Sequence, residues 1–146
     1  NLYPDASFIM NTGDMVDYGS NFRQWNWMFN SASKNLMNTV LMPTAGNHET
    51  KGAGFADANN FTLSDIPVQN EKNGIYYSYD YNNAHFIVLN TNELNSDFTL
   101  STAQLEWLKS VAAASSAQWQ IVSIHKAIYS NGGVLISSLC GFLCIQ

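Results

Sequence analysis

Charged residues are scarce in this chain: Asp, Glu, Lys and Arg make up 12% of its 146 residues, where about 25% is usual. Basic side chains are the rarest, with six Lys or Arg against eleven Asp or Glu, and the formal net charge is −5. So few basic residues provide no basic face for a phosphate backbone, and we expect no nucleic-acid partner. An acidic protein that binds a phosphorylated ligand needs bound cations to offset the charge repulsion.

Cysteines, leader segments and long apolar runs are also lacking. The two cysteines, Cys140 and Cys144, form neither a disulfide framework nor a CxxC zinc pattern. No signal peptide is visible, and no apolar run reaches the ~20 residues of a transmembrane helix. Residue 1 is not Met, so we expect a processed or partial product. The sequon at Asn60 permits glycosylation, which leaves a secreted or extracytoplasmic location open.

The residues that are present suit a globular α/β domain. Hydrophobic residues make up 46% of the chain and aromatic residues 13%. Short apolar runs predict buried strands at 6–12, 40–45 and 119–125, and Asn82-Asn83 predicts the turn of a β-hairpin. Residues 50–73 are predicted to form a long loop with one helical turn. With two helices added, the order strand, helix, strand, hairpin, helix, strand is typical of α/β proteins.

Two amphipathic helices are predicted from apolar spacing and cap residues. Ser20 is the expected cap of the first helix, and Ser101 with Gln104 forms a capping box for the second. The expected buried positions of the first helix are Phe22, Trp25, Phe29, Ala32 and Leu36, and those of the second are Leu105, Leu108 and Ala112. We interpret the aromatic stripe as a core-facing surface and not as a ligand platform.

Polar residues follow three of the predicted strands, at the ends where sites collect in α/β sheets. They are Asp14, then Asn47 and His48, then His125. Taken singly, each is explained by turn chemistry or a structural role. Together, a carboxylate, an amide oxygen and an imidazole can converge on one divalent cation such as Mn, Fe(II) or Zn. His85 alternates with Ile87 inside a strand and is interpreted as structural.

The motifs GDMVDYG, GNHE and SIHKAIYS, in that order, resemble the calcineurin-like metallophosphoesterases, and most of all their purple-acid-phosphatase-like branch. The segments YYSYDYNNAHFIVLNTNE and QLEWLK resemble the same branch, and the likeness covers roughly residues 5–131. It implies an α/β sandwich of mixed sheets flanked by helices. It also implies hydrolysis of a small phosphate ester by a binuclear centre of Fe, Zn or Mn ions.

The resemblance also implies a role for each matching residue. Asp14 would bridge two metal ions, Asn47 and His125 would bind the second ion, and His48 would be catalytic as a proton donor or as a stabiliser of the phosphoryl group. Asp17 and Glu49 would support the site without binding metal. Asp17 stands where purple acid phosphatases place a metal-binding Tyr, so the resemblance does not support a tyrosinate–iron site.

The chain departs from the family pattern at both ends. An upstream Asp-x-His or Asp-x-Gly pair and a downstream Gly-His-x-His motif are both missing, and the sequence has three His residues in all. We therefore expect a domain truncated at both ends, with at most one bound ion and impaired or absent hydrolysis. The alternative is a remnant of the same fold that works as a non-catalytic binding or structural module.

The last residues form an apolar tail. We expect a partial metallophosphoesterase domain at 1–131 and a separate tail at 132–146, whose final 13 residues carry no charge. A core strand and an interfacial segment are alternatives for this tail. We favour a third interpretation, the product of a shifted reading frame or a mispredicted gene end.

Overall fold

The computed structural model describes residues 5–52, 54–59, 75–95, 99–126 and 141–145. In these ranges the strands are β1 (Phe8–Asn11), β2 (Val40–Pro43), β3 (Tyr77–Tyr81), β4 (Ala84–Val88), β5 (Trp119–Ile124) and β6 (Gly141–Ile145). The helices are α1 (Phe22–Leu36), α2 (Phe55–Ala58) and α3 (Thr102–Ala114). In this part of the chain no helix has the length and apolar character that a membrane crossing requires.

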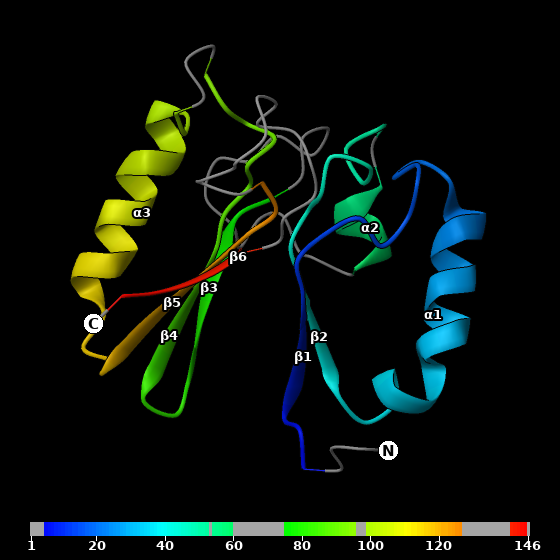
Figure 1. Ribbon diagram of the computed structural model, residues 1–146, viewed down its shortest axis with the longest axis horizontal. Helices are drawn as coiled ribbons and strands as arrows, with labels where there is room; N and C mark the ends of the chain where they lie inside the picture. Colours follow the sequence, from blue (N-terminus) through cyan, green and yellow to red (C-terminus); the bar gives the residue numbers. More distant parts are fainter. Residues whose placement is uncertain (1–4, 53, 60–74, 96–98, 127–140, 146) are drawn as a thin grey trace.

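The elements form layers, with a helix outside each of two sheets (Figure 1). Strands β1 and β2 make a two-stranded sheet with α1 on its outer side, and the four-stranded sheet β3-β4-β5-β6 has α3 on its outer side. The pairs β1–β2 and β4–β5 are parallel, whereas β3–β4 and β5–β6 are antiparallel. These mixed sheets flanked by helices confirm the α/β sandwich expected from the sequence.

Two apolar clusters hold the layers together, and strand β4 contributes to both because successive side chains point to opposite faces. Val88 packs with Trp25, Phe55 and other residues of the first cluster, which α1 helps to cover. Ile87 packs in the second cluster, which is covered by the inner face of α3. The members of the two clusters are Val16, Trp25, Ala45, Phe55, Ile75, Tyr77 and Val88, then Ile87, Leu89, Val122 and Ile124.

Two hydroxyl contacts tie the end of β2 to the four-stranded sheet. The hydroxyl groups of Thr44 and Ser123 lie 2.7 Å apart in the interior, and the Tyr77 hydroxyl donates to the Pro43 carbonyl at 2.8 Å. These contacts bring the carboxyl ends of β2 and β5 together. The segments that follow the two strands therefore start from neighbouring points.

Helix α3 begins as the sequence predicts, with the Ser101 side chain accepting from the Gln104 N–H, whereas the cap of α1 and one apolar position of each helix differ. The cap of α1 is Asn21, whose side chain accepts from the Arg23 N–H, so Ser20 as the cap was wrong. Phe22 is 50% exposed and Leu105 is 37% exposed, so neither belongs to a buried stripe. Trp25 is buried and Phe29, Leu108 and Ala112 pack against the apolar clusters, as the sequence predicts, and the buried residue of α3 that it did not predict is Gln104.

The predicted hairpin is confirmed, with Asn82 in the turn between β3 and β4. Asn82 has φ 53°, a left-handed conformation that Asn tolerates better than most residues. His85 on β4 is buried, and its Nδ1 lies 2.7 Å from the Asp80 carboxylate on the opposite strand. Its contacts are those of a structural residue, as the sequence suggested.

Several expectations fall at or outside the limits of the description. The helical turn expected within residues 50–73 is α2, whereas the sequon at Asn60 lies outside the described residues. Residues 141–145 of the apolar tail form β6, which pairs with β5 at the edge of the sheet. The boundary expected at residue 131 lies in a range that is not described, so it stays a prediction.

Replacement of Gln104 by Leu tests how α3 is fixed to the sheet. The buried Gln104 side chain accepts from the Asn90 N–H at 2.8 Å and donates to the Asn90 carbonyl at 3.1 Å. Gln104→Leu is similar in size but leaves the Asn90 N–H without this acceptor and the Asn90 carbonyl with only the longer bond from the Glu93 N–H at 3.3 Å, which should lower the free energy of unfolding by about 1–3 kcal/mol. Urea denaturation measures this loss. Gln118→Leu, which alters an exposed carboxamide, is the control and should leave the urea midpoint in place.

Candidate metal centre

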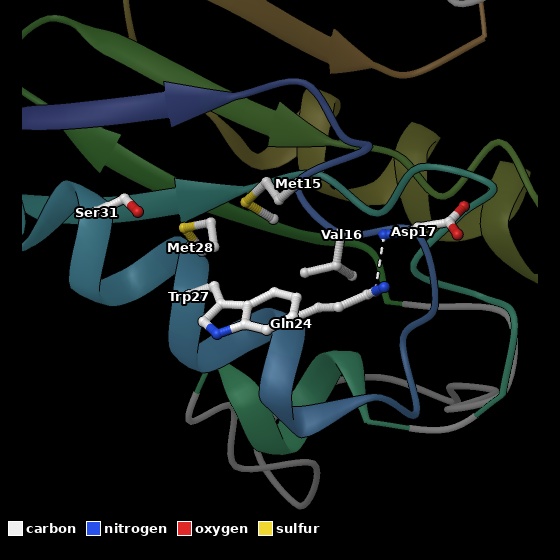
Figure 2. A pocket seen from close by; sticks show the side chains of 7 residues that line it. All are labelled: Met15, Val16, Asp17, Gln24, Trp27, Met28 and Ser31. Carbon is white, nitrogen blue, oxygen red and sulfur yellow. Dashed lines mark hydrogen bonds between the residues drawn. The ribbon is translucent and has the colours of Figure 1, made fainter.

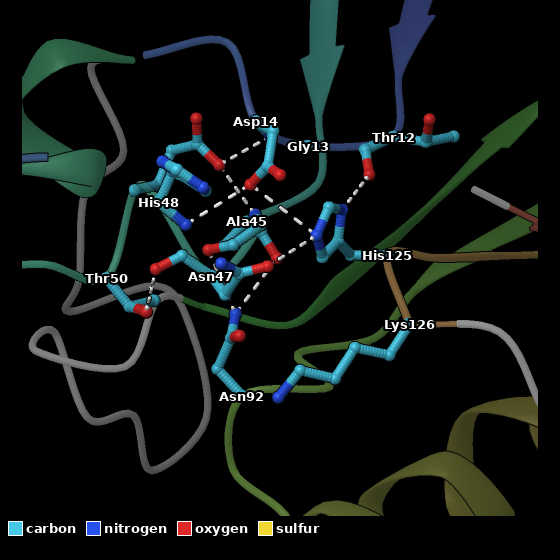
Figure 3. A network of polar contacts seen from close by, with 12 residues as sticks. Thr12, Gly13, Asp14, Ala45, Asn47, His48, Thr50, Asn92, His125 and Lys126 are labelled. Atoms are coloured by element: carbon cyan, nitrogen blue, oxygen red, sulfur yellow. Dashed lines mark hydrogen bonds and ion pairs between the residues drawn. The ribbon is translucent and has the colours of Figure 1, made fainter. Parts of the chain in front are cut away.

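Side chains from the ends of three strands meet at one point (Figure 3). Asp14 comes after β1, Asn47 after β2 and His125 after β5. The Nε2 atom of His125 lies 3.0 Å from the Asn47 Oδ1 atom and 3.5 Å from the Asp14 Oδ1 atom. The structure thus brings together the three residues that the sequence indicated as metal ligands.

The hydrogen bond on the far side of His125 determines what its Nε2 atom offers. His125 is buried, and its Nδ1 atom donates to the Thr12 carbonyl at 2.8 Å. A neutral imidazole that donates through Nδ1 carries its lone pair on Nε2. That lone pair faces two oxygen atoms that are also electron-pair donors. Histidine ligands of metals usually donate their other ring N–H to a carbonyl or carboxylate in this way, so the arrangement fits a cation.

The same donor set is small. It consists of one carboxylate, one neutral amide and one imidazole. Because one of the three is an amide, they do not make a group of three or more His, Cys, Asp or Glu side chains, and the described ranges contain no such group that could hold a metal ion. Their oxygen and nitrogen donors match one divalent cation of the kind that accepts mixed ligands. They do not provide ligands for a second ion.

The backbone at the site depends on two glycines. Gly13 has φ 105°, and a Cβ atom there would lie 2.6 Å from His125 Nδ1, in the way of its bond to Thr12. Gly46 allows close approach, because a Cβ atom there would overlap Asp14 and would lie 2.7 Å from Glu49 Oε2. Asp14 itself has φ 56°, a conformation that Asp and Asn adopt more readily than other side chains with a Cβ.

Glu49 fixes the two loops that carry the ligands. Its buried carboxylate accepts from the backbone N–H groups of Asp14 at 2.8 Å and Gly46 at 2.7 Å through Oε2. Its Oε1 atom accepts from the Val16 N–H at 3.0 Å. With both oxygens used in this way, Glu49 anchors the loop after β1 to the loop after β2.

His48 lies beside the three ligands and belongs to a second polar group. Its backbone N–H donates to Asp14 Oδ1 at 3.2 Å, while its ring Nδ1 lies 2.7 Å from Asp17 Oδ1. The Lys51 ammonium lies 3.2 Å from the same carboxylate oxygen and 2.9 Å from His48 Nδ1. Hydrogen bonds from Lys51 and then from His48 lower the pKa of Asp17 below its ordinary value of 3.8. A cavity of about 280 Å³ opens where Asp14, Asp17 and His48 meet.

One supporting residue was missed in the sequence. The Asn92 side chain donates to the carbonyl groups of Ala45 at 3.1 Å and Gly46 at 3.2 Å, so it fixes the loop after β2 from the opposite side. Asn92 follows β4, as the ligands follow their own strands. Applying the strand-end rule to this fourth strand would have identified it. Next to it, Lys126 donates its backbone N–H to the Thr91 hydroxyl, and burial lowers the pKa of its ammonium group.

Glu49→Gln should destabilise the protein by about 2–3 kcal/mol. The amide keeps the size of the side chain but replaces one acceptor oxygen with an N–H donor that would face backbone N–H groups. Urea denaturation followed by circular dichroism measures the change. Glu106→Gln alters an exposed carboxylate that pairs with Lys109, and it should leave the midpoint unchanged. Equal midpoints for the two variants would contradict the anchoring role.

Lys51→Met should raise the pKa of Asp17 toward 3.8, because the hydrogen bond from Lys51 is the largest cause of its depression. Because the pKa of Asp17 is lower in the folded state than in the unfolded state, Asp17 stabilises the folded protein at pH values above its unfolded pKa, and this stabilisation is lost as the pH falls through its folded pKa. In the variant the two pKa values lie closer together, so Asp17 should contribute less to stability. NMR titration of the Asp17 carboxyl carbon measures the shift, with Lys109→Met as a control that leaves it unmoved.

Comparison with known proteins agrees with the fold. The sequence model described as calcineurin-like phosphoesterase matches residues 2–140. No curated protein matches at a significant level. The solved structure of a purple acid phosphatase isolated from yellow lupin (Lupinus luteus) seeds is similar in fold, with a TM-score of 0.64 and 21% sequence identity. The similarity covers 88% of this chain and 25% of that one, so the chain spans a quarter of the length of that protein. From the extent of the family match, the chain belongs to the calcineurin-like phosphoesterases.

Proposed function

We propose that Asp14, Asn47 and His125 hold one divalent cation and that this site serves hydrolysis of a small phosphate ester in the complete enzyme. The observation that carries the proposal is the contact of His125 Nε2 with two oxygens while its Nδ1 donates to Thr12. The family match over residues 2–140 supports the phosphoesterase class. Mn, Fe and Zn suit the donor set.

Cations of this kind supply Lewis-acid polarisation of a phosphoryl oxygen and activation of water near neutral pH. The positive charge would also offset the formal net charge of −5 when a phosphate group approaches. In the chain itself, Asp14 Oδ1 lies 3.5 Å from His125 Nε2 and accepts from the His48 backbone N–H at 3.2 Å, and a bridging role for Asp14 in the complete enzyme rests on the family resemblance. The described residues give a second ion no further ligands, so we propose at most one ion for this chain.

His48 is the proposed proton donor. Lys51 lies within hydrogen-bonding distance of its Nδ1 atom, and an imidazole that accepts through Nδ1 carries its proton on Nε2. In that form Nε2 can donate to the leaving oxygen of an ester. Asp17 and Lys51 therefore act by positioning His48.

A second candidate is a binding or structural module that retains the fold without hydrolysis. The small donor set favours it, since one of the three ligands is a neutral amide. A secreted or extracytoplasmic location is proposed for either candidate. Hydrolysis of p-nitrophenyl phosphate separates them: a cation-dependent rate supports the enzyme, whereas cation and phosphate binding without turnover supports the module.

Calorimetric titration with Mn²⁺ tests the cation site directly, and no more than one ion per chain should bind. Asp14→Asn removes the negative charge but tolerates the left-handed backbone, so it should weaken binding by about tenfold or more. His85→Gln alters a buried histidine outside the site and should bind Mn²⁺ like the unaltered chain. Two tightly bound ions per chain, or an Asp14→Asn variant with unchanged affinity, would refute the proposal.

A further inference from the structure

A groove runs between α1 and the loop that carries Asp14 (Figure 2). It is open to solvent and offers a volume of about 330 Å³, and its lining residues are Met15, Val16, Asp17, Gln24, Trp27, Met28 and Ser31. This volume lies at the lower end of the range for small-molecule sites. A group of one or two rings matches it.

The groove is mainly apolar because its two largest polar groups are already engaged. The Gln24 side-chain oxygen accepts from the backbone N–H groups of Asp17 at 3.0 Å and Tyr18 at 2.8 Å. The Asp17 carboxylate contacts His48 and Lys51. The Gln24 bonds also fix the loop against α1, so the groove is formed before any ligand arrives. A preformed site lowers the entropy cost of binding.

Trp27 gives the groove an exposed aromatic surface. Two residues earlier on the same helix, Trp25 is buried and donates its indole N–H to the Gly19 carbonyl at 2.9 Å. Trp27 is 60% exposed, an unusual state for so large a side chain, and it lies along the groove beside Gln24. An exposed indole can stack on a planar ring or cover an aliphatic group.

The groove adjoins the cavity at Asp14 and His48. The cavity at Asp14 and His48 shares three lining residues with it, namely Met15, Val16 and Asp17. A ligand whose phosphoryl group lies near Asp14 and His48 can therefore extend its other end along α1. The neutral organic part of an ester suits this end, since the groove offers apolar contacts and no free cationic group among its lining residues.

We propose that this groove binds the aromatic or apolar alcohol portion of the phosphate ester. The inference rests on the proposed function, and it assigns Trp27, Met15 and Met28 to substrate selection. It predicts a preference for aryl and other bulky apolar esters over small alkyl esters. Specificity of this kind comes from contacts with parts of the substrate that do not react.

Non-hydrolysable phosphonates test the groove whether or not the chain turns over substrate. Calorimetry in the presence of Mn²⁺ would compare 1-naphthylmethylphosphonate with methylphosphonate, and the naphthyl compound should bind about tenfold more tightly. Trp27→Ala should remove most of that ratio and leave affinity for methylphosphonate and for Mn²⁺ unchanged. Phe22→Ala, an exposed aromatic of α1 that does not line the groove, should keep the full ratio.

The outcomes separate this inference from the proposed function. Equal affinity for the two phosphonates, or a ratio that survives Trp27→Ala, would overturn the groove assignment. Phosphonate binding that changes neither on removal of Mn²⁺ nor in the Asp14→Asn variant would overturn the cation site. The ratio of the affinities for the two phosphonates would still test the groove. If neither phosphonate binds, titration with 1-naphthol decides: binding that Trp27→Ala weakens supports the groove, and no binding rejects it.

Discussion

The buried carboxylate of Glu49 is the contact on which the rest of the site depends. It accepts hydrogen bonds from three backbone N–H groups in two loops that follow different strands. A single side chain thereby fixes the left-handed turn at Asp14 and the close approach of Gly46. Without it, a buried cluster of N–H groups would lack acceptors, and burial of such groups is costly. The resulting geometry presents Asp14 Oδ1 toward His125, while the Asp14 side chain stays 29% exposed.

His125 extends this arrangement from the small sheet to the large one. Its ring is held at Nδ1 by the carbonyl of Thr12, next to β1, although the residue itself follows β5. The hydroxyl pair of Thr44 and Ser123 reinforces the same junction. The ligand cluster thus lies at the interface between the two sheets, and the distances between its side chains depend on how closely the sheets pack. That is why a Cβ atom at Gly13 would disturb the histidine as well as its own loop.

Much of the fold could be predicted from local patterns. Alternating and continuous apolar runs gave the strand positions, the Asn82-Asn83 turn gave the hairpin, and polar residues after the strands indicated where a site would lie. Local patterns failed where the decisive contact is distant in the sequence. Ser20 and Asn21 are equally plausible caps until the fold directs the Ser20 hydroxyl to the Lys51 carbonyl.

The supporting contacts show the same limit. Gln104 looks like the partner of Ser101 in a capping box, yet its carboxamide bonds to the backbone of Asn90 instead. Asp17 contacts His48 and Lys51 at separations of 31 and 34 positions, and Asn92 contacts Ala45 and Gly46 at separations of 47 and 46. The sequence could therefore indicate the candidate ligands, and the family resemblance indicated Asp17 and Glu49 as supporting residues, but neither showed which atoms these residues contact. The functional roles of the ligands themselves stay predictions.

The sheet contacts differ greatly in how far apart along the chain their partners lie. The β3–β4 hairpin pairs residues that are close together in the sequence, so its formation costs little chain entropy and can occur early. The site joins residues separated by 78 and 113 positions, and each such closure must wait for the sheets to assemble. Ligand binding is thus coupled to the least local contacts of the fold. An occupied site would hold the two sheets together and oppose their partial separation, whereas the hairpin does not depend on the ligand.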